Sequence, residues 1–277
     1  MPWFNAGHQT DRRSRLRQPP GSALKAAMNA VFNVFLPGVE TCPLCDRPIR
    51  PNRIGACGAC VGRIAFVTAP ICGKCGKPVR GCEPGTSAPG RGRLCGDCKT
   101  RPHFFSVTRA VGIYDGGLRE YVHALKYGGK PQAARPLGRL MASLAMAHVN
   151  LRGCDGLVAV PLHRDRLELR GYNQAELLAR NAAPGLGLPY IHGVMARTRP
   201  TQSQTSLSPS TRARNLRNAF KVLDPRPVSG RRLLLVDDVY TTGITVDEAA
   251  RVLLRSGAVE VAVVCLAVGV TDRDLRE

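Results

Sequence analysis

The sequence predicts an α/β protein with a parallel sheet flanked by helices, preceded by a small cysteine-rich module. Short apolar runs such as residues 233–236 suit strands that are buried on both faces. Between these runs lie segments whose apolar residues recur at helical spacing, and an alternation of strands and helices gives a parallel sheet. Nine of the eleven cysteines fall between residues 42 and 98, which predicts a separate module there.

The chain begins with two segments that we expect to lie outside the sheet. Residues 1–21 contain four closely spaced arginines and a Pro-Pro-Gly sequence, which predicts a disordered basic tail. Residues 22–40 predict a short amphipathic helix that Pro37 and Gly38 end, because its apolar residues recur at helical spacing. These residues are Leu24, Met28, Val31, Phe32 and Phe35.

Eight cysteines form four Cys-x-x-Cys pairs within residues 41–101, which predicts a double zinc ribbon. One pair places two thiolates on one side of a tight turn, and two pairs complete a tetrahedral site. We expect the pairs to combine in sequence order, with an interleaved arrangement as the alternative. The first site is then formed by Cys42, Cys45, Cys57 and Cys60, and the second by Cys72, Cys75, Cys95 and Cys98.

A site with four cysteine ligands has no open coordination position, so both zinc ions are predicted to be structural. The module is too small for an adequate core without metal. Regular spacing of the pairs argues against disulfides. Cys82 lies in a Gly/Pro-rich loop, and we expect it to take no part.

Residues 102–277 predict the α/β domain. We expect strands over residues 105–114, 157–160, 233–236 and 259–268, and a long hairpin with strands over residues 188–196 and 216–223. Helices are expected over residues 118–125, 133–149, 173–183 and 246–254. Asn173 is a predicted N-cap, and Gly257 is the predicted stop of the last helix. Ligands of such sheets bind at the carboxyl ends of the strands.

A small, hydroxyl-rich turn joins the strand at residues 233–236 to the last helix. Backbone N–H groups at a helix N-terminus are unpaired and favour an anion, and threonine hydroxyls add donors. We therefore expect a phosphate there. The residues predicted to hold it are Tyr240, Thr241, Thr242, Gly243, Ile244 and Thr245.

Asp237 and Asp238 directly precede this turn. Adjacent carboxylates repel each other, so they imply a cation or donating hydroxyls as partners. A sugar 5-phosphate satisfies both halves of the site, and the stretch resembles the phosphoribosyl pyrophosphate (PRPP) signature of type I phosphoribosyltransferases. The alternative is an ordinary strand, loop and helix with an aspartate cap. A nucleoside triphosphatase would need a G-x-x-x-x-G-K-[ST] loop, which the sequence lacks.

Three further stretches are candidates for the same site. Leu162 and His163 follow a predicted strand in a tight loop that suits a pyrophosphate, although a proline-terminated strand explains it too. Arg170 belongs to the stretch that opens the helix capped by Asn173, so it is either an anion contact or part of a capping turn. Residues 177–223 contain no acid, and residues 200–209 are polar, which favours a basic lid over a solvated linker. Arg212 and Arg214 lie at the base of this lid.

The formal net charge is +20, from 40 lysines and arginines against 20 aspartates and glutamates. This excess favours polyanionic partners, which are phosphorylated substrates or single-stranded nucleic acid.

Runs of about 18 apolar residues, which a membrane span needs, do not occur. The N-terminus does not have the pattern of a signal peptide. We therefore expect a cytoplasmic protein without a membrane span.

Several stretches, in this order, resemble the ComF family. They are the four cysteine pairs, residues 124–128 (Ala-Leu-Lys-Tyr-Gly), 160–163 (Val-Pro-Leu-His), 170–174 (Arg-Gly-Tyr-Asn-Gln), 197–204 (Arg-Thr-Arg-Pro-Thr-Gln-Ser-Gln), 214–215 (Arg-Asn) and 236–243 (Val-Asp-Asp-Val-Tyr-Thr-Thr-Gly). The resemblance covers about residues 30–270. It departs mildly at Ser203 and Ser206, where family members often have glycine or proline.

The resemblance implies a double zinc ribbon fused to a type I phosphoribosyltransferase domain that binds PRPP with Mg²⁺. It implies a glycosyl transfer in which Asp237 and Asp238 hold the ribose and serve catalysis. The implied PRPP contacts are the turn at residues 240–245, Leu162, His163, Arg170, Arg212 and Arg214. The resemblance also implies a link to competence, with single-stranded DNA and a competence helicase as partners. The alternative is a non-catalytic module that binds nucleic acid or a helicase and keeps this fold.

Overall fold

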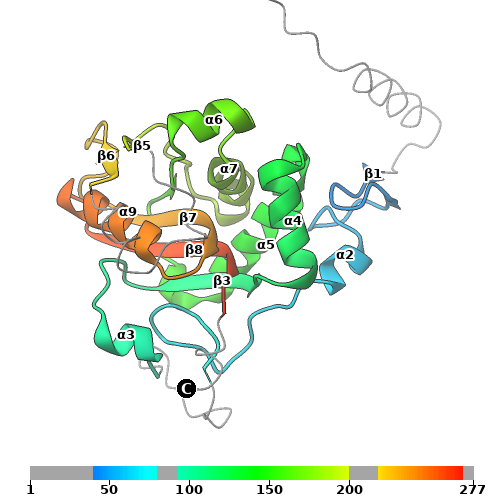
Figure 1. The fold of residues 1–277 in the computed structure, drawn as a ribbon, viewed down its shortest axis with the longest axis horizontal. Helices are drawn as coiled ribbons and strands as arrows, with labels where there is room; N and C mark the ends of the chain where they lie inside the picture. The colour runs from blue at the N-terminus through cyan, green and yellow to red at the C-terminus, as the bar shows by residue number, and fades with distance from the viewer. Residues whose placement is uncertain (1–39, 80–92, 200–217, 271–277) are drawn as a thin grey trace, which may run out of the picture. The chain divides into compact units, whose positions relative to one another are not determined.

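The computed structural model describes residues 40–79, 93–199 and 218–270 (Figure 1). The described residues from Thr41 onwards belong to one compact unit. Several predictions fall outside the described residues: the basic tail at residues 1–21, the helix at residues 22–40 apart from its last residue, Cys82, the polar segment at residues 200–209, Arg212 and Arg214.

Four parallel strands form the central sheet of the described residues. Their order is β3 (Thr108–Ile113), β8 (Glu260–Val268), β7 (Arg232–Tyr240) and β4 (Gly156–Ala159). This confirms the predicted α/β fold. β7 is longer than the apolar run at residues 233–236, because its pairing with β8 continues as far as Tyr240 and Val268. Asp237 and Asp238 therefore belong to the strand itself.

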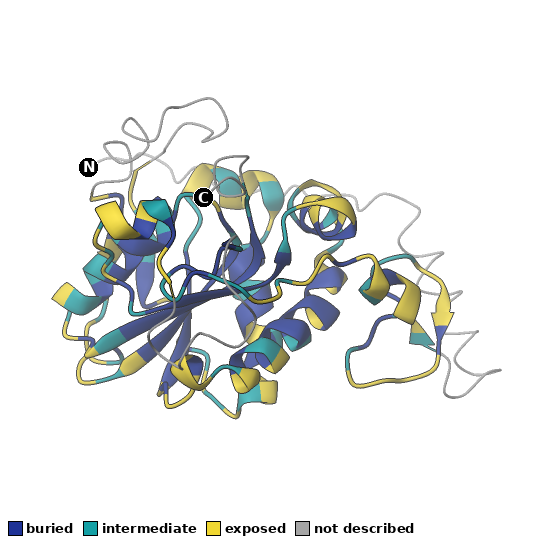
Figure 2. Cartoon of the chain, turned by 90° about the horizontal axis from the view of Figure 1, so that it is seen from below, coloured by how far each residue is buried: buried dark blue, intermediate teal, exposed yellow. Residues whose placement is uncertain are grey.

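Helices cover both faces of the sheet. Leu234 and Val236 of β7 lie in a core shared with α4 (Gly116–Tyr127), α5 (Ala134–Ala147) and α7 (Gln174–Leu186). Leu233 and Leu235 point to the other face and pack in a core shared with α9 (Ile244–Arg255). The strands are accordingly buried along their length, as Figure 2 shows. This burial on both faces explains why β7 is a continuous apolar run rather than an alternating one.

The predicted hairpin is present, with shorter strands than expected. β5 (Met195–Arg197) pairs antiparallel with β6 (Phe220–Val222). The N-terminal part of the expected first strand does not belong to β5, although Tyr190 forms a bridge with Leu157 of β4. α5 is flanked by the short 3₁₀ helices η1 (Pro131–Ala133) and η2 (Val149–Leu151).

The helix that follows the loop after β4 was not predicted. α6 (Arg164–Arg170) begins after His163, whose side chain caps it, and ends at Gly171 in the left-handed conformation. Arg170 is the last residue of α6, so the stretch at residues 170–174 ends this helix before it opens the next one. Asn173 is confirmed as the N-cap of α7, since its side chain accepts a hydrogen bond from the Ala175 N–H.

The cysteine-rich module packs on both faces of the sheet. Its first half contains the paired strands β1 (Glu40–Thr41) and β2 (Pro48–Ile49) and the helix α2 (Gly58–Gly62), and it shares the core of α4 and α5. Its second half contains α3 (Gly96–Thr100) and shares the core of α9. The connecting residues 65–67 run along β3, where the Ile113 N–H donates to the Ala65 carbonyl at 2.7 Å.

None of the described helices combines the length and apolar character that crossing a membrane requires.

Candidate functional site

Two groups of four cysteines meet in the part of the chain that the structure describes. Within each group all sulfur atoms lie within 4.8 Å of one another. The groups are Cys42, Cys45, Cys57 and Cys60, and Cys72, Cys75, Cys95 and Cys98, which confirms pairing in sequence order. With Zn–S bonds of about 2.3 Å, the sulfurs of a tetrahedral site lie roughly 3.8 Å apart. The Cys45–Cys57 and Cys75–Cys95 sulfur distances are both 3.6 Å, so the residues fit zinc.

Both groups are built in the same way. The first pair of each group lies on a turn, and the second pair opens α2 or α3. The Cys57 N–H donates to the Cys42 sulfur at 3.3 Å, and the Cys95 N–H donates to the Cys72 sulfur at the same distance. Such donors stabilise thiolates. Each group supplies four sulfur ligands, which leaves no open position and indicates structural metal.

A pocket of about 430 Å³ opens at the carboxyl ends of β4 and β7. Its polar lining combines two acids, threonines of the turn, and basic side chains from α4, α6 and β5. These residues are Asp237, Asp238, Thr241, Thr245, Lys126, Arg166, Arg170 and Arg197. Asp237 and Asp238 are the only acids among the described residues that line it. The sheet thus brings the predicted acids, turn and loop to one place.

The two acids are almost fully buried, with exposed fractions of 8% for Asp237 and 5% for Asp238. Asp238 lies next to α4, and its Oδ2 is 2.9 Å from the Nζ of Lys126. The Asp238 N–H donates to Oδ1 of Asp237 at 2.8 Å. Burial, and then the charge of Asp238, raise the pKa of Asp237 to about 7. Asp237 is therefore a carboxyl group that titrates near neutral pH.

Lys126 was noted in the sequence only as part of the resemblance. Burial lowers the pKa of Lys126, but the charge of Asp238 and the hydrogen bond to it outweigh burial, so that the pKa is raised overall. Lys126 thus carries a positive charge beside the acids. Its sequence neighbours do not indicate this partner, because Asp238 lies on a different element far along the chain.

The turn after β7 has two sides. Thr241 and Thr245 line the pocket, whereas Tyr240 and Ile244 are buried, with exposed fractions of 3% and 5%. Gly243 has a φ of 74° and precedes the first residue of α9. A Cβ added to Gly243 would lie 2.7 Å from Cζ of Tyr240, so the phenol ring packs directly beneath the turn. Thr242 and Gly243 are not among the residues that line the pocket.

Three arginines, Arg166, Arg170 and Arg197, also line the pocket. Arg170 stacks on the ring of Tyr127 at 5.2 Å and donates to Oε1 of Gln174. Arg197 lies over the ring of Phe220, and burial lowers its pKa. Arg166 was not singled out in the sequence, because α6 was not predicted.

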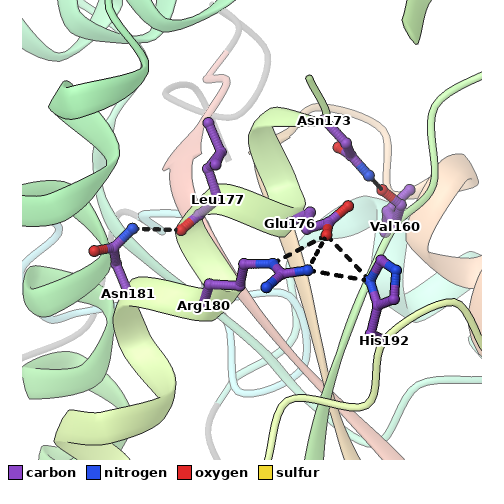
Figure 3. Close-up of polar contacts among 7 residues, drawn as sticks. All are labelled: Val160, Asn173, Glu176, Leu177, Arg180, Asn181 and His192. Carbon is purple, nitrogen blue, oxygen red and sulfur yellow. Dashed lines mark hydrogen bonds and ion pairs between the residues drawn. The ribbon is translucent and has the colours of Figure 1, made fainter. Parts of the chain in front are cut away.

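The two residues predicted as contacts in the loop after β4 differ in their position relative to the pocket. Leu162 lines the pocket, whereas His163 is not among the lining residues. The Nδ1 of His163 accepts a hydrogen bond from the Asp165 N–H at 3.4 Å, so this side chain caps α6. Asn173 holds the loop from the other side, because its Nδ2 donates to the Val160 carbonyl at 3.0 Å (Figure 3).

The outer face of α7 carries a separate cluster. Arg180 donates to Oε1 of Glu176 at 2.8 Å, and Nδ1 of His192 lies 3.1 Å from the same oxygen (Figure 3). The Asn181 side chain donates to the Leu177 carbonyl at 2.8 Å. The carboxylate of Glu176 is thus paired and is not a free acid for the pocket.

The pocket is suited to an anion that also carries hydroxyls. Helix N-terminal N–H groups and threonine hydroxyls can hold a phosphate, and the arginines can hold a second anionic group. Carboxylates can accept hydrogen bonds from hydroxyls or bind a divalent cation through oxygen.

Two families match different parts of the chain. The double zinc ribbon domain family matches residues 31–99, and the phosphoribosyl transferase domain family matches residues 168–276. The chain is 36% identical to the DNA utilization protein YhgH of Salmonella typhimurium, over 83% of this chain and 97% of that protein.

Two relatives of lower sequence identity also match most of this chain. Identity is 29% to competence protein F of Haemophilus influenzae, over 80% of this chain and 94% of that protein. It is 28% to competence protein ComFC of Bacillus subtilis, over 73% of this chain and 78% of that protein.

Proposed function

The chain belongs to the ComF family, and from this premise we propose that it binds PRPP with Mg²⁺ and transfers the phosphoribosyl group to a nucleophile. The observation that carries the proposal is the pocket in which a hydroxyl-rich helix N-terminus, two acids and three arginines converge. The names of the relatives support a role in competence and DNA use.

Each part of the ligand has a matching part of the pocket. The 5-phosphate binds at Thr241, Thr245 and the N–H groups of the turn. The ribose hydroxyls donate to Asp237 and Asp238, and the pyrophosphate lies toward the loop at residues 160–162 and the arginines of α6 and β5. Arg212 and Arg214 stay predicted contacts.

The transfer breaks the bond between C1 of the ribose and the pyrophosphate oxygen and forms a bond from C1 to the nucleophile. Bound Mg²⁺ supplies charge neutralisation for the leaving pyrophosphate. The arginines stabilise the same charge, and the acids hold the ribose in position, so orientation and electrostatics supply the rate. The nucleophile loses its proton to water when it bonds to C1.

The test is release of pyrophosphate from PRPP and Mg²⁺ in the presence of nucleobases, amines or ammonia, one at a time. We expect one class to release pyrophosphate and to yield a phosphoribosyl product of matching mass. Release that is equal with every nucleophile and with water alone would contradict transfer. The variant Arg170→Gln should lower the rate, whereas Arg226→Gln, at an exposed pair with Asp224, should not.

A second candidate function is binding of single-stranded nucleic acid. A hollow of about 580 Å³ lies between the first zinc ribbon, α5 and α7, and no acid is among its described lining residues. It is lined by Arg53, Arg135, Arg139 and Arg180 together with Asn52, Asn181 and Ser143. Guanidinium and amide groups of this kind suit a phosphodiester backbone without sequence preference. A competence helicase and a cytoplasmic location stay predictions.

Binding of a labelled oligo-dT at several salt concentrations tests this candidate. The double variant Arg135→Gln/Arg139→Gln should bind more weakly, with a salt slope smaller by about two. The matched control is Arg226→Gln. If the double variant bound as tightly as the control, the hollow would not be the binding surface.

A further inference from the structure

The second zinc ribbon contacts the helix that follows the phosphate-binding turn. We propose that metal in this ribbon positions the turn for its ligand, with His103 and Tyr240 as positioning residues. The inference rests on the proposed function, because it assigns a role to the ribbon in the binding of PRPP. Both ribbons have a site of four cysteines, and the inference gives the positioning role to the second ribbon alone.

The first contact route runs through His103. Its side chain is buried, with an exposed fraction of 2%. Nε2 lies 3.6 Å from the sulfur of Cys98, and Nδ1 lies 3.4 Å from Oδ1 of Asp247. The imidazole ring therefore bridges a zinc ligand and the first turn of α9. Residues that contact a metal ligand from outside orient that ligand, and here the same contact reaches the helix.

Asp247 is held from more than one side. The Phe104 N–H donates to its Oδ1 at 2.7 Å, and Arg101 lies 3.5 Å from its Oδ2. The Asp247 N–H donates to the Gly243 carbonyl at 2.9 Å. This aspartate thus joins the segment after the second ribbon to the turn itself.

The second route is a series of packed rings. His103 stacks on Phe105, with ring centroids 4.6 Å apart, and Phe105 meets Tyr240 edge to face at 6.2 Å. The ring of Tyr240 lies beneath Gly243. Phe105 and Tyr240 share one buried core with the four cysteines of the second ribbon. A shift of the ribbon would therefore be transmitted to the underside of the turn, because packed interiors have little free volume.

Both contact routes begin at the second ribbon, and metal is needed to hold the cysteines of this ribbon in place. Four thiolates within 4.8 Å of one another repel without a cation, and the bound metal holds Cys98 where His103 meets it. The first ribbon makes different contacts. The hydroxyl of Tyr121 in α4 donates to the Cys60 carbonyl at 3.1 Å, and Arg63 pairs with Glu120 at 2.6 Å. The contacts described for the first ribbon lead to α4 and α5 and not to the turn.

The test compares His103→Ala, His103→Gln and Tyr121→Phe in the full zinc-loaded chain. Zinc content is measured by elemental analysis, hydrogen exchange is followed at residues 241–247, and PRPP with Mg²⁺ is titrated calorimetrically. We expect His103→Ala to raise exchange at the turn and to weaken PRPP binding about tenfold. The amide of His103→Gln can donate a hydrogen bond to Cys98 or to Asp247. This variant should therefore recover part of the PRPP affinity and part of the protection from exchange. Tyr121→Phe should match the wild type in both measurements.

The outcomes separate the two proposals. If His103→Ala exchanges and binds like the wild type, whether it holds one zinc or two, the positioning role is wrong. If His103→Ala does not fold, Asp247→Asn takes its place, because it keeps the shape of the side chain and weakens the same contacts. A wild type that does not bind PRPP would contradict the proposed function, while the exchange at residues 241–247 would still decide the coupling.

Discussion

Nζ of Lys126 lies 2.9 Å from Oδ2 of Asp238, which joins the last turn of α4 to the carboxyl end of β7. The lysine supplies a cation for a pair of acids whose charges would otherwise repel. It also fixes Asp238 toward α4, while Asp237 keeps a raised pKa. The pocket therefore holds one paired and one proton-binding carboxyl group.

Replacing this lysine should destabilise the fold. Lys126→Met leaves Asp238 buried without its cation, and breaking a buried pair costs about 3–5 kcal/mol. The added variant Asp238→Asn removes the orphaned charge, so the double variant should regain part of this stability. Urea unfolding of the three proteins measures the effect. Equal stability of the single and double variants would contradict the pairing.

The raised pKa of Asp237 predicts a pH dependence of stability. The folded state holds this proton up to about pH 7, whereas the unfolded chain releases it near its ordinary pKa of about 3.9. The folded state therefore binds more protons across this interval, and the contribution of Asp237 to the unfolding free energy falls as pH rises.

Urea unfolding of the wild type and of Asp237→Asn from pH 4.5 to pH 8 checks this prediction. The stability difference, wild type minus variant, should decrease up to about pH 7 and then stay level. A difference that increases with pH would show that the carboxylate is the favoured form in the folded state.

The two cysteine groups predict about two zinc ions per chain. Cys45→Ser should lose one ion and keep the other, because each group supplies its own four ligands. Cys154→Ser is the matched control, since Cys154 is buried but belongs to neither group. Elemental analysis after anaerobic purification gives the count. Loss of both ions in Cys45→Ser would mean that the sites are not independent.

Gly243 should not tolerate a side chain. Gly243→Ala forces a positive φ on alanine and brings its Cβ 2.7 Å from Cζ of Tyr240. We expect PRPP binding at least about tenfold weaker, because the turn must shift. Gly187→Ala is the control: Gly187 also has a positive φ, but a Cβ there meets nothing within 4 Å. Calorimetric titration of both variants distinguishes a shifted turn from simple backbone strain.

Much of this architecture follows from local sequence. The run at residues 233–236 predicted a strand buried on both faces because four apolar residues in succession leave no polar face. The regular cysteine pairs predicted two metal sites, whereas the tight Cys-x-x-Cys turns left an interleaved grouping open, and the structure brings the pairs together in sequence order. The acids and the turn were predicted as neighbours because they are adjacent in sequence.

Contacts between distant elements were not predictable in this way. The sequence around Lys126 does not show that α4 ends beside Asp238, because this depends on the order of strands and the packing of α4. The link from Cys98 through His103 to Asp247 joins α3 to α9 through the segment that follows α3. α6 was missed because it is short and has no buried residue, so it lacks an apolar repeat.

The most direct test of the central claim is a calorimetric titration of PRPP with Mg²⁺ into the zinc-loaded wild type and into Asp237→Asn/Asp238→Asn. We predict saturable binding of one PRPP per chain to the wild type and loss of this binding in the folded variant. Unchanged affinity in the variant would contradict the assignment of the two acids, and absence of binding to the wild type would contradict the proposed function itself.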